Sequence, residues 1–177
     1  LALADLLYGG ERFVTAINMS EFQEKHTVSR LVGSPPGYVG YGEGGILTEA
    51  VRQRPYSVVL LDECEKADLD VMNLFYQVFD KGSLSDGEGR HINFRNTIII
   101  LTSNLGAADR NRKVGLTATT TDDSLAQHYL AAVRRHFAPE MVNRIERIIP
   151  FAALGAETLR TICRLQVERV RHRRGLA

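Results

Sequence analysis

The chain has 177 residues, of which 44% are apolar, and its 22 basic and 21 acidic side chains leave a formal net charge of +1. This length and apolar content suit one domain with its own core. The near-neutral charge excludes bulk electrostatic attraction as a basis for binding nucleic acid or an anionic membrane. The apolar runs are too short to cross a bilayer and no signal-peptide pattern opens the chain, so we expect a cytoplasmic protein without membrane insertion.

The first part of the chain places helix and strand patterns around a glycine-rich stretch. Residues 1–8 have helical apolar spacing and end at a glycine pair, and residues 13–19 predict a strand. A helix is predicted to begin at Ser20, because acidic residues follow this capping serine. Residues 33–45, GSPPGYVGYGEGG, hold six glycines and two prolines. They can therefore form neither helix nor strand.

Two apolar runs then alternate with helical patterns. Residues 46–54 and 67–79 have helical spacing. Residues 56–63, YSVVLLDE, form a continuous apolar run that ends in acid, and residues 96–104, NTIIILTSN, repeat this design. Such runs are typical of parallel strands buried on both faces. The polar residues 80–96 between them predict a long excursion or a hairpin.

The last part of the chain continues the same alternation. Residues 105–123 predict a loop, residues 124–137 a helix and residues 145–151, IERIIPF, a short strand. Residues 157–177 predict a basic amphipathic helix. Strands that alternate with helices predict an α/β fold with a parallel sheet.

Two strand ends carry the polar groups that a ligand would need. Ligands of open parallel sheets bind beyond the carboxyl ends of the strands, where Asp62, Glu63 and Asn104 lie in this chain. An apolar strand followed by Asp-Glu is the Walker B arrangement of nucleotide hydrolases, in which Asp helps to hold Mg²⁺ and Glu activates the attacking water. Asn104 could hold that water or the γ-phosphate. The alternative is that the two carboxylates merely begin a helix, where the helix dipole favours them, but their pairing with Asn104 favours the site.

The glycine-rich residues 33–45 do not have the pattern of a phosphate-binding loop. They lack GxxxxGK[ST] and contain no lysine. Their distinctive content is Tyr38 and Val39, which stand between Gly37 and Gly40. An aromatic ring raised between glycines predicts contact with a partner. The alternative is a flexible surface loop whose tyrosine folds back onto the core.

Two further residues leave alternatives open. Arg144 precedes the last apolar run, where it could pair with Glu140 or Glu146 or reach a neighbouring subunit's γ-phosphate as an arginine finger. The cysteines, Cys64 and Cys163, show no paired spacing and predict free thiols in a reducing cytosol.

Six motifs in fixed order resemble the second ATPase domain of the Clp/Hsp100 AAA+ unfoldases: NMSEF, GSPPGYVGYGEGG, VVLLDE-EKAD, DGEGRHINFRNT, LTSN and FAPEMVNRI. The stretches SEFQEKHTVSRLVG, GYGEGG and NLFYQVFDKG are more similar to ClpV, which recycles the contracted sheath of type VI secretion, than to the disaggregase ClpB. The resemblance implies the large subdomain of an AAA+ P-loop NTPase over residues 1–151, with a parallel sheet and flanking helices. It implies the first helix of the small α-helical lid subdomain over residues 152–177.

The resemblance also implies residue roles at the nucleotide. Asp62 and Glu63 match the Walker B pair, with ATP and Mg²⁺ as cofactors and Asp62 holding Mg²⁺ indirectly. Asn104 matches sensor 1, and Arg144 matches the arginine finger offered to the adjacent subunit.

The implied partner is a protein substrate that a homohexamer threads through its central pore, with the secretion sheath as one such substrate. Gly37, Tyr38, Val39 and Gly40 match the first pore loop, which grips this polypeptide. Residues 82–91 match the second pore loop. Nucleic acid is not an expected partner, because the basic tail of the last helix is typical of one solvated helix face.

Departures from the family pattern set a limit. No Walker A motif precedes Leu1, and the second sensor arginine and the P-loop strand are absent from the sequence. We expect flanking residues of the intact ATPase to supply them and the 177 residues alone to be inactive; the alternative is a non-hydrolysing binding or oligomerisation module. Cys64 stands where the family has an aliphatic residue. It predicts a small buried hydrophobe, although alkylation of an accessible Cys64 would crowd Glu63 and slow hydrolysis.

Overall fold

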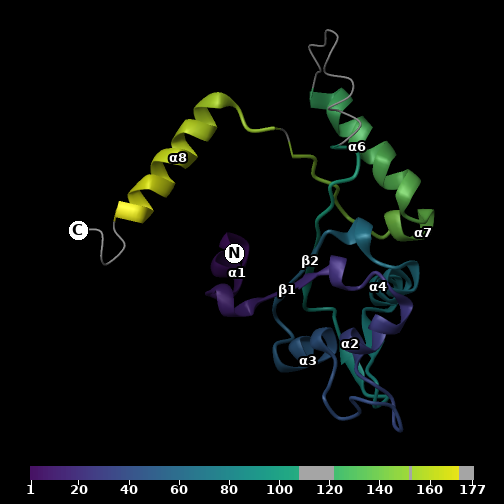
Figure 1. Ribbon diagram of the computed structural model, residues 1–177. Coiled ribbons are helices and arrows are strands. Elements are labelled where there is room, and N and C mark those ends of the chain that lie inside the picture. Colours follow the sequence, from purple (N-terminus) through teal and green to yellow (C-terminus); the bar gives the residue numbers. More distant parts are fainter. Residues whose placement is uncertain (108–121, 152, 172–177) are drawn as a thin grey trace.

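The computed structural model describes residues 1–107, 122–151 and 153–171 (Figure 1). Its centre is a parallel three-stranded sheet with the order β1 (Val14–Asn18), β2 (Val58–Asp62) and β5 (Ile98–Leu101). The register pairs β1 with β2 from Val14 opposite Val58 to Asn18 opposite Asp62. The three carboxyl ends therefore meet at one edge, and the predicted α/β fold with a parallel sheet is confirmed.

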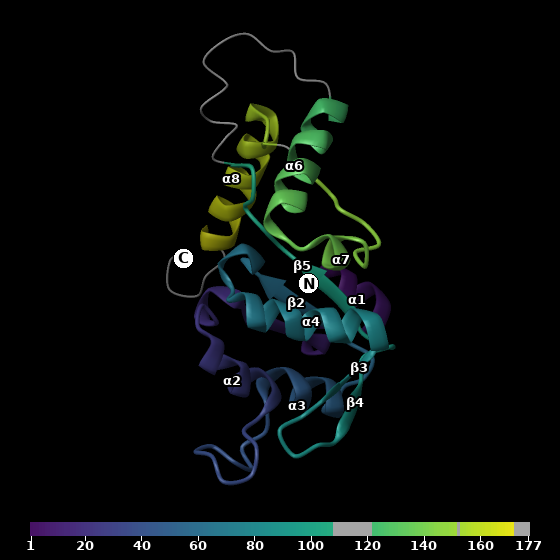
Figure 2. The same cartoon turned by 90° about the vertical axis from the view of Figure 1, so that its right-hand side faces the viewer.

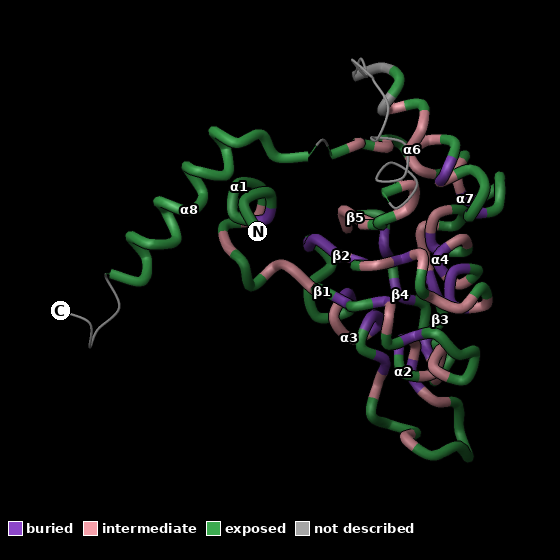
Figure 3. The backbone as a smooth tube through the Cα atoms, turned by 45° about the horizontal axis from the view of Figure 1, so that its top comes forward, coloured by how far each residue is buried: buried purple, intermediate pink, exposed green. Residues whose placement is uncertain are grey.

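Helices flank this sheet on both sides. The described part of the chain forms the helices α1 (Ala2–Tyr8), α2 (Val28–Val32), α3 (Ile46–Gln53), α4 (Leu69–Lys81), α6 (Asp122–His136), α7 (Pro139–Val142) and α8 (Ala156–Arg171). Short 3-10 turns span Glu11–Phe13, Met19–Glu21, Lys25–Thr27 and Cys64–Lys66. Figure 1 shows α4 on one side of the sheet and α1 on the other, with α8 set apart from both. No described residue of α8 is buried, as its colour in Figure 3 shows.

Local signals explain why α4 forms where it does. The Asp68 carboxylate accepts a hydrogen bond from the Asp70 N–H at 2.8 Å, which caps the helix at its start. Gly82 ends the helix in the left-handed conformation, with φ of 66°. The apolar stripe between these ends includes Val71 and Phe75, which join the main core cluster. Burial of this stripe against the sheet stabilises the layer from which the site residues extend.

The polar segment after α4 is a hairpin, which was one of the two structures predicted for it. β3 (Ser83–Ser85) pairs antiparallel with β4 (His91–Asn93). Leu84 and Ile92 lie opposite each other in this pair and are both buried. Their burial fixes the hairpin to the core and leaves its tip, residues 86–90, free to meet other segments.

The helix predicted to begin at Ser20 is wrong. The segment forms two 3-10 turns before α2, and Ser20 is not a capping residue, since its own N–H donates to the Asn18 side chain at 3.0 Å. The cause is Phe22, a buried core residue whose carbonyl accepts the Asp68 N–H at 2.9 Å. That tertiary hydrogen bond replaces the one that a helix would use.

The strand predicted over residues 145–151 is also wrong. These residues are irregular, and no described strand pairs with them. Ile149 and Phe151 are exposed, and Pro150 has no N–H to donate to a ladder. The apolar pattern alone therefore does not make a strand here.

Three smaller expectations have different outcomes. Most of the predicted loop at residues 105–123 lies outside the described residues, and a helix follows it as predicted. Cys64 and Cys163 are both free thiols, as predicted. Within the described ranges, no helix is long and apolar enough to span a membrane.

Candidate functional site

The carboxyl end of β2 has an unusual backbone. Asp62 is the last residue of the strand, and Glu63 follows with φ of 58° and ψ of 45°. Glu63 is the one residue other than glycine with a positive φ in the described part of the chain. The left-handed conformation is strained for a side chain of this kind, and strain of this type collects at functional sites. It turns the chain abruptly from β2 into the 3-10 turn Cys64–Lys66.

Thr102, the first residue after β5, fastens this turn to the neighbouring strand. Its hydroxyl oxygen accepts a hydrogen bond from the Glu63 N–H at 3.2 Å and donates its proton to the Asp62 carboxylate. The Thr102 carbonyl also accepts the Cys64 N–H at 3.0 Å. One threonine therefore fixes the positions of both predicted Walker B residues.

The Glu63 side chain already has a cationic partner within its own turn. Its carboxylate lies 2.9 Å from the Lys66 ammonium group. Hydrogen bonding to Glu63 raises the pKa of Lys66, so the lysine stays charged. The Glu63 carboxylate therefore lies against a cation in the absence of any ligand.

Asn104 lies at the end of β5, near the turn after β2, as the sequence predicts. Its backbone N–H donates to the Glu65 carboxylate at 3.2 Å, and the residue is exposed. The structure therefore brings Asp62, Glu63 and Asn104 to one edge of the sheet. The sequence interpretation gave Thr102 no role, although a hydroxyl residue directly after the strand beside an Asp-Glu pair is a usable signal.

Arg144 is held against α4. Its guanidinium lies 2.5 Å from the Asp80 carboxylate in the last turn of that helix. The prediction of an ion pair with Glu140 or Glu146 is wrong, because Arg144 pairs with Asp80 instead. This contact is about half exposed, so it contributes little to stability.

Cys64 is a small buried residue, as predicted. It is 1% exposed, and its thiol donates to the Leu61 carbonyl at 3.2 Å. Burial raises the pKa of the thiol to about 12. Because the side chain is inaccessible, the condition for alkylation next to Glu63 is not met.

The glycine-rich loop (residues 33–45) presents an aromatic ring to solvent. Tyr38 is 70% exposed and Val39 100% exposed, so the alternative in which the tyrosine folds back onto the core is wrong. Gly37 and Gly40 have φ of 88° and 84°, a conformation that glycine adopts without strain. These glycines form tight turns on either side of the two exposed side chains.

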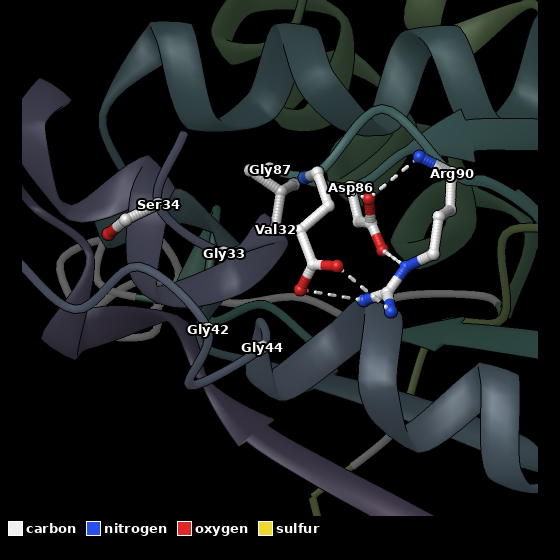
Figure 4. A pocket seen from close by; sticks show the side chains of 9 residues that line it. Val32, Gly33, Ser34, Gly42, Gly44, Asp86, Gly87 and Arg90 are labelled. Atoms are coloured by element: carbon white, nitrogen blue, oxygen red, sulfur yellow. Dashed lines mark hydrogen bonds and ion pairs between the residues drawn. The ribbon is translucent and has the colours of Figure 1, made fainter. Parts of the chain in front are cut away.

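The hairpin tip (residues 86–90) lies beside this loop, at the opposite end of the molecule from α6 (Figure 2). Figure 4 shows the small hollow between them, with Asp86 and Arg90 on one wall and Gly33, Gly42 and Gly44 on the other. The site at the strand ends and the exposed loop are therefore two separate regions of one molecule.

Comparison with known proteins identifies the family of this chain. Residues 1–148 match the family described as AAA domain (Cdc48 subfamily). This chain belongs to the AAA+ family. The AAA+ chain is 52% identical over 170 residues to chaperone protein ClpB 1 of Synechocystis sp. and 51% identical over 177 residues to AAA+ ATPase ClpV1 of Pseudomonas aeruginosa. These alignments cover 96% and 98% of the chain but 19% of each relative, so the AAA+ chain spans about a fifth of their length.

Two solved structures of Hsp104 have the same fold. One is the extended conformation of the S. cerevisiae Hsp104 complex with casein, with a TM-score of 0.85 and 37% identity. The other is a closed state with ATPγS and FITC casein, with a TM-score of 0.83 and 38% identity. Each match covers 98% of the AAA+ chain and 30% of the Hsp104 chain. The resemblance to the Clp/Hsp100 branch of the family is confirmed.

The side chains present fit a Mg²⁺ ion that is held mostly by other ligands. Within the described residues, no three His, Cys, Asp or Glu side chains form a metal site by themselves. Mg²⁺ in nucleotide sites characteristically uses one or two protein oxygens together with phosphate oxygens and water. The Asp62 carboxylate, oriented by Thr102, suits that part.

Proposed function

We propose that the intact protein is an ATP-driven hexameric unfoldase and that this AAA+ chain carries the hydrolytic part of its nucleotide site. The observation that carries the proposal is the strained backbone of Glu63, fixed by Thr102 at the carboxyl edge of the sheet. The strained residue itself does not join the core cluster, so the strain does not serve to bury the Glu63 side chain. It is expected if Glu63 must hold one fixed position beside a reacting group.

The residues of the site have complementary roles in this proposal. Mg²⁺·ATP, when bound, supplies the transferable phosphoryl group and the cation that offsets its charge. Asp62 assists in holding the ion, and Glu63 accepts a proton from the attacking water once its carboxylate is released from Lys66. The exposed Asn104 orients that water or the γ-phosphate. Arg144 extends toward the adjacent subunit after leaving Asp80, whose exposed ion pair is weak enough to exchange.

The glycine-rich loop is proposed to grip the substrate. Gly37, Tyr38, Val39 and Gly40 form its exposed part. An aromatic ring and a branched aliphatic side chain can contact the apolar surface of any unfolded peptide, so the contact requires no particular sequence. The substrate is therefore proposed to be an unfolded polypeptide that passes through the centre of a homohexamer.

The last helix is proposed to begin a second subdomain. We propose that residues 1–151 form the large subdomain and that residues 152–177 begin the small lid subdomain. Several apolar side chains of α8 are exposed, and Leu159, Ile162 and Val170 share one face of the helix. Such a face requires a packing partner, which the rest of a helical lid would supply.

The finer substrate assignment follows the sequence similarity to ClpV. We propose that the substrate is the contracted sheath of type VI secretion, and a ClpB-type disaggregase is the second candidate. The almost equal identity to ClpB and ClpV relatives leaves both functions to experiment.

The test uses the intact protein with two substrates, contracted sheath tubules and heat-aggregated protein. ATP-dependent release of sheath subunits without recovery of the aggregate supports the proposed function, and the reverse supports the disaggregase. Tyr38→Ala should abolish whichever activity is present, and Tyr56→Ala, which removes another exposed tyrosine, should not. No nucleotide-dependent action on either substrate would favour a non-hydrolysing binding module.

A further inference from the structure

The base of the glycine-rich loop is closed by direct backbone contact. The loop begins after Val32 and ends at Gly45, where α3 begins. A Cβ atom on Gly45 would lie 2.2 Å from the Leu31 carbonyl oxygen and 2.5 Å from the Gly33 nitrogen. The two ends of the loop therefore touch, and no side chain larger than hydrogen fits between them.

The hairpin tip rests on this closed base. The Gly87 N–H donates a hydrogen bond to the Val32 carbonyl at 2.9 Å. A Cβ atom on Gly87 would lie 2.5 Å from the carbonyl carbon and oxygen of Gly33. The loop and the tip, which are about fifty residues apart in the sequence, are thus in backbone contact through two glycines.

Asp86 holds the tip in the shape that this contact requires. Its side chain is 4% exposed. Its carboxylate accepts hydrogen bonds from the Arg90 backbone N–H at 2.9 Å and the Arg90 guanidinium at 2.7 Å (Figure 4). It also accepts the backbone N–H of Glu88 at 3.0 Å. Burial raises the pKa of Asp86, but these hydrogen bonds outweigh it and lower the pKa overall. A buried carboxylate with three donors is a rigid centre for a five-residue turn.

Charges on α3 face the same turn. Glu49 and Arg52 are ion-paired at 2.7 Å on this helix. The field of Arg90 acts on Glu49, and the fields of Asp86 and Glu88 act on Arg52. Arg52 and Arg90 repel each other at the same place, so these fields show only that the tip lies near the helix that follows the loop while it touches the segment that precedes it.

We infer that Asp86 is a positioning residue for the glycine-rich loop. It holds the hairpin tip in the shape that lets Gly87 contact Val32 and Gly33, and through this contact the loop and the tip move as one body. This inference rests on the proposed function, in which Tyr38 grips a polypeptide. A loop with glycine turns on both sides of the gripping side chains would bend under load. Its contact with the tip transmits movement of the hairpin, and of the sheet domain behind it, to Tyr38.

Substitutions in the intact protein can separate this role from the grip itself. Gly87→Ala places a methyl group between the two backbones, and Asp86→Ala removes three hydrogen bonds that shape the tip. Asp86→Asn retains an oxygen for the two backbone donors and loses the charge. Gly155→Ala is the matched control, because its added methyl group would meet no atom within 4 Å.

The first measurement is the number of ATP molecules hydrolysed per substrate protein unfolded. We expect at least a five-fold increase for Gly87→Ala and Asp86→Ala, about a two-fold increase for Asp86→Asn, and the parental value for Gly155→Ala. The second is the fluorescence anisotropy of a dye at Val39→Cys, in a Cys163→Ser background because Cys163 is exposed. We expect it to fall in Gly87→Ala and Asp86→Ala, because the loop is released.

The outcomes distinguish the inference from the function on which it rests. Tyr38→Ala in the same assay tests the grip, and its normal unfolding would contradict the proposed function. A different result would overturn only the inference: Tyr38→Ala loses unfolding, while the Asp86 and Gly87 variants keep the parental ATP consumption per substrate unfolded and the parental anisotropy. If the alanine variants fail to assemble, the milder Asp86→Asn still tests the inference, and parental ATP consumption per substrate unfolded in this variant overturns it.

Discussion

The hydroxyl group of Thr102 donates a hydrogen bond to the carboxylate of Asp62, across the ends of two parallel strands. The same oxygen accepts the backbone N–H of Glu63 at 3.2 Å. A threonine hydroxyl has one proton to donate, and here that proton is directed to Asp62. The orientation of one acidic side chain and the backbone of the next thus depend on a single atom.

Replacement of this hydroxyl should weaken the metal part of the site. Thr102→Val keeps the shape of the side chain but leaves the Glu63 N–H without its partner and the Asp62 carboxylate free to rotate. We expect the half-saturating Mg²⁺ concentration for nucleotide binding by the intact protein to rise at least three-fold. The free energy of unfolding should fall by about 1–3 kcal/mol, the cost of an unsatisfied partly buried donor.

Two variants control this prediction. Thr102→Ser restores the hydroxyl and should recover the Mg²⁺ dependence. Thr158→Val, at an exposed position of α8, should leave it unchanged. An unaltered Mg²⁺ dependence in Thr102→Val would show that the orientation of Asp62 does not depend on Thr102.

The two cysteines should differ sharply in reactivity. Burial raises the pKa of the Cys64 thiol to about 12, so at pH 8 only about one molecule in ten thousand carries the thiolate. We expect iodoacetamide to modify the exposed Cys163 and to spare Cys64 in the native protein, as measured by peptide mass spectrometry. Both should react in denaturant, and stoichiometric native labelling of Cys64 would contradict its burial.

The same thiol gives a prediction for stability at high pH. Its pKa in the folded protein lies above the unfolded value of 9.0. The unfolded state therefore loses the proton first, and the contribution of Cys64 is complete below pH 9 and declines as the pH rises toward 12. Cys64→Ala should remove this part of the alkaline loss of stability.

The core beneath the site depends on Phe75 of α4. This side chain is fully buried and lies 6.5 Å from the ring of Phe79, centroid to centroid. We expect Phe75→Ala to lower the free energy of unfolding by about 3–5 kcal/mol in urea titrations, because it leaves a cavity. The matched variant Phe151→Ala, at a side chain that is 85% exposed, should change it by less than about 0.5 kcal/mol.

The sequence predicts well those segments whose residue pattern is compatible with one kind of structure. The run before Asp62 is apolar on both faces and four residues long, which is typical of a buried parallel strand. Its polar end then had to lie at the ligand edge of the sheet. The exposure of Tyr38 was predictable for a similar reason, since glycines on both sides leave the ring no helix or strand in which to pack.

The parts that it misses depend on contacts distant in sequence. The helix expected at Ser20 fails because Phe22 makes a tertiary hydrogen bond to Asp68. Arg144 pairs with Asp80, which lies 64 positions away in α4. Asp86 is a residue type that is common in turns, so the sequence does not single it out. Only the structure shows that its carboxylate is buried and accepts hydrogen bonds from three donors.

In the proposed function Glu63 activates the attacking water, and the rate of ATP hydrolysis by Glu63→Gln in the intact protein tests this role most directly. Glutamine keeps the size of the side chain but cannot accept the proton, so the rate should fall at least 100-fold, the usual contribution of a general base. ATP and the protein substrate should stay bound in a trapped complex. Glu157→Gln, in the exposed first turn of α8, should hydrolyse ATP at the parental rate. Hydrolysis by Glu63→Gln at the parental rate would contradict the account.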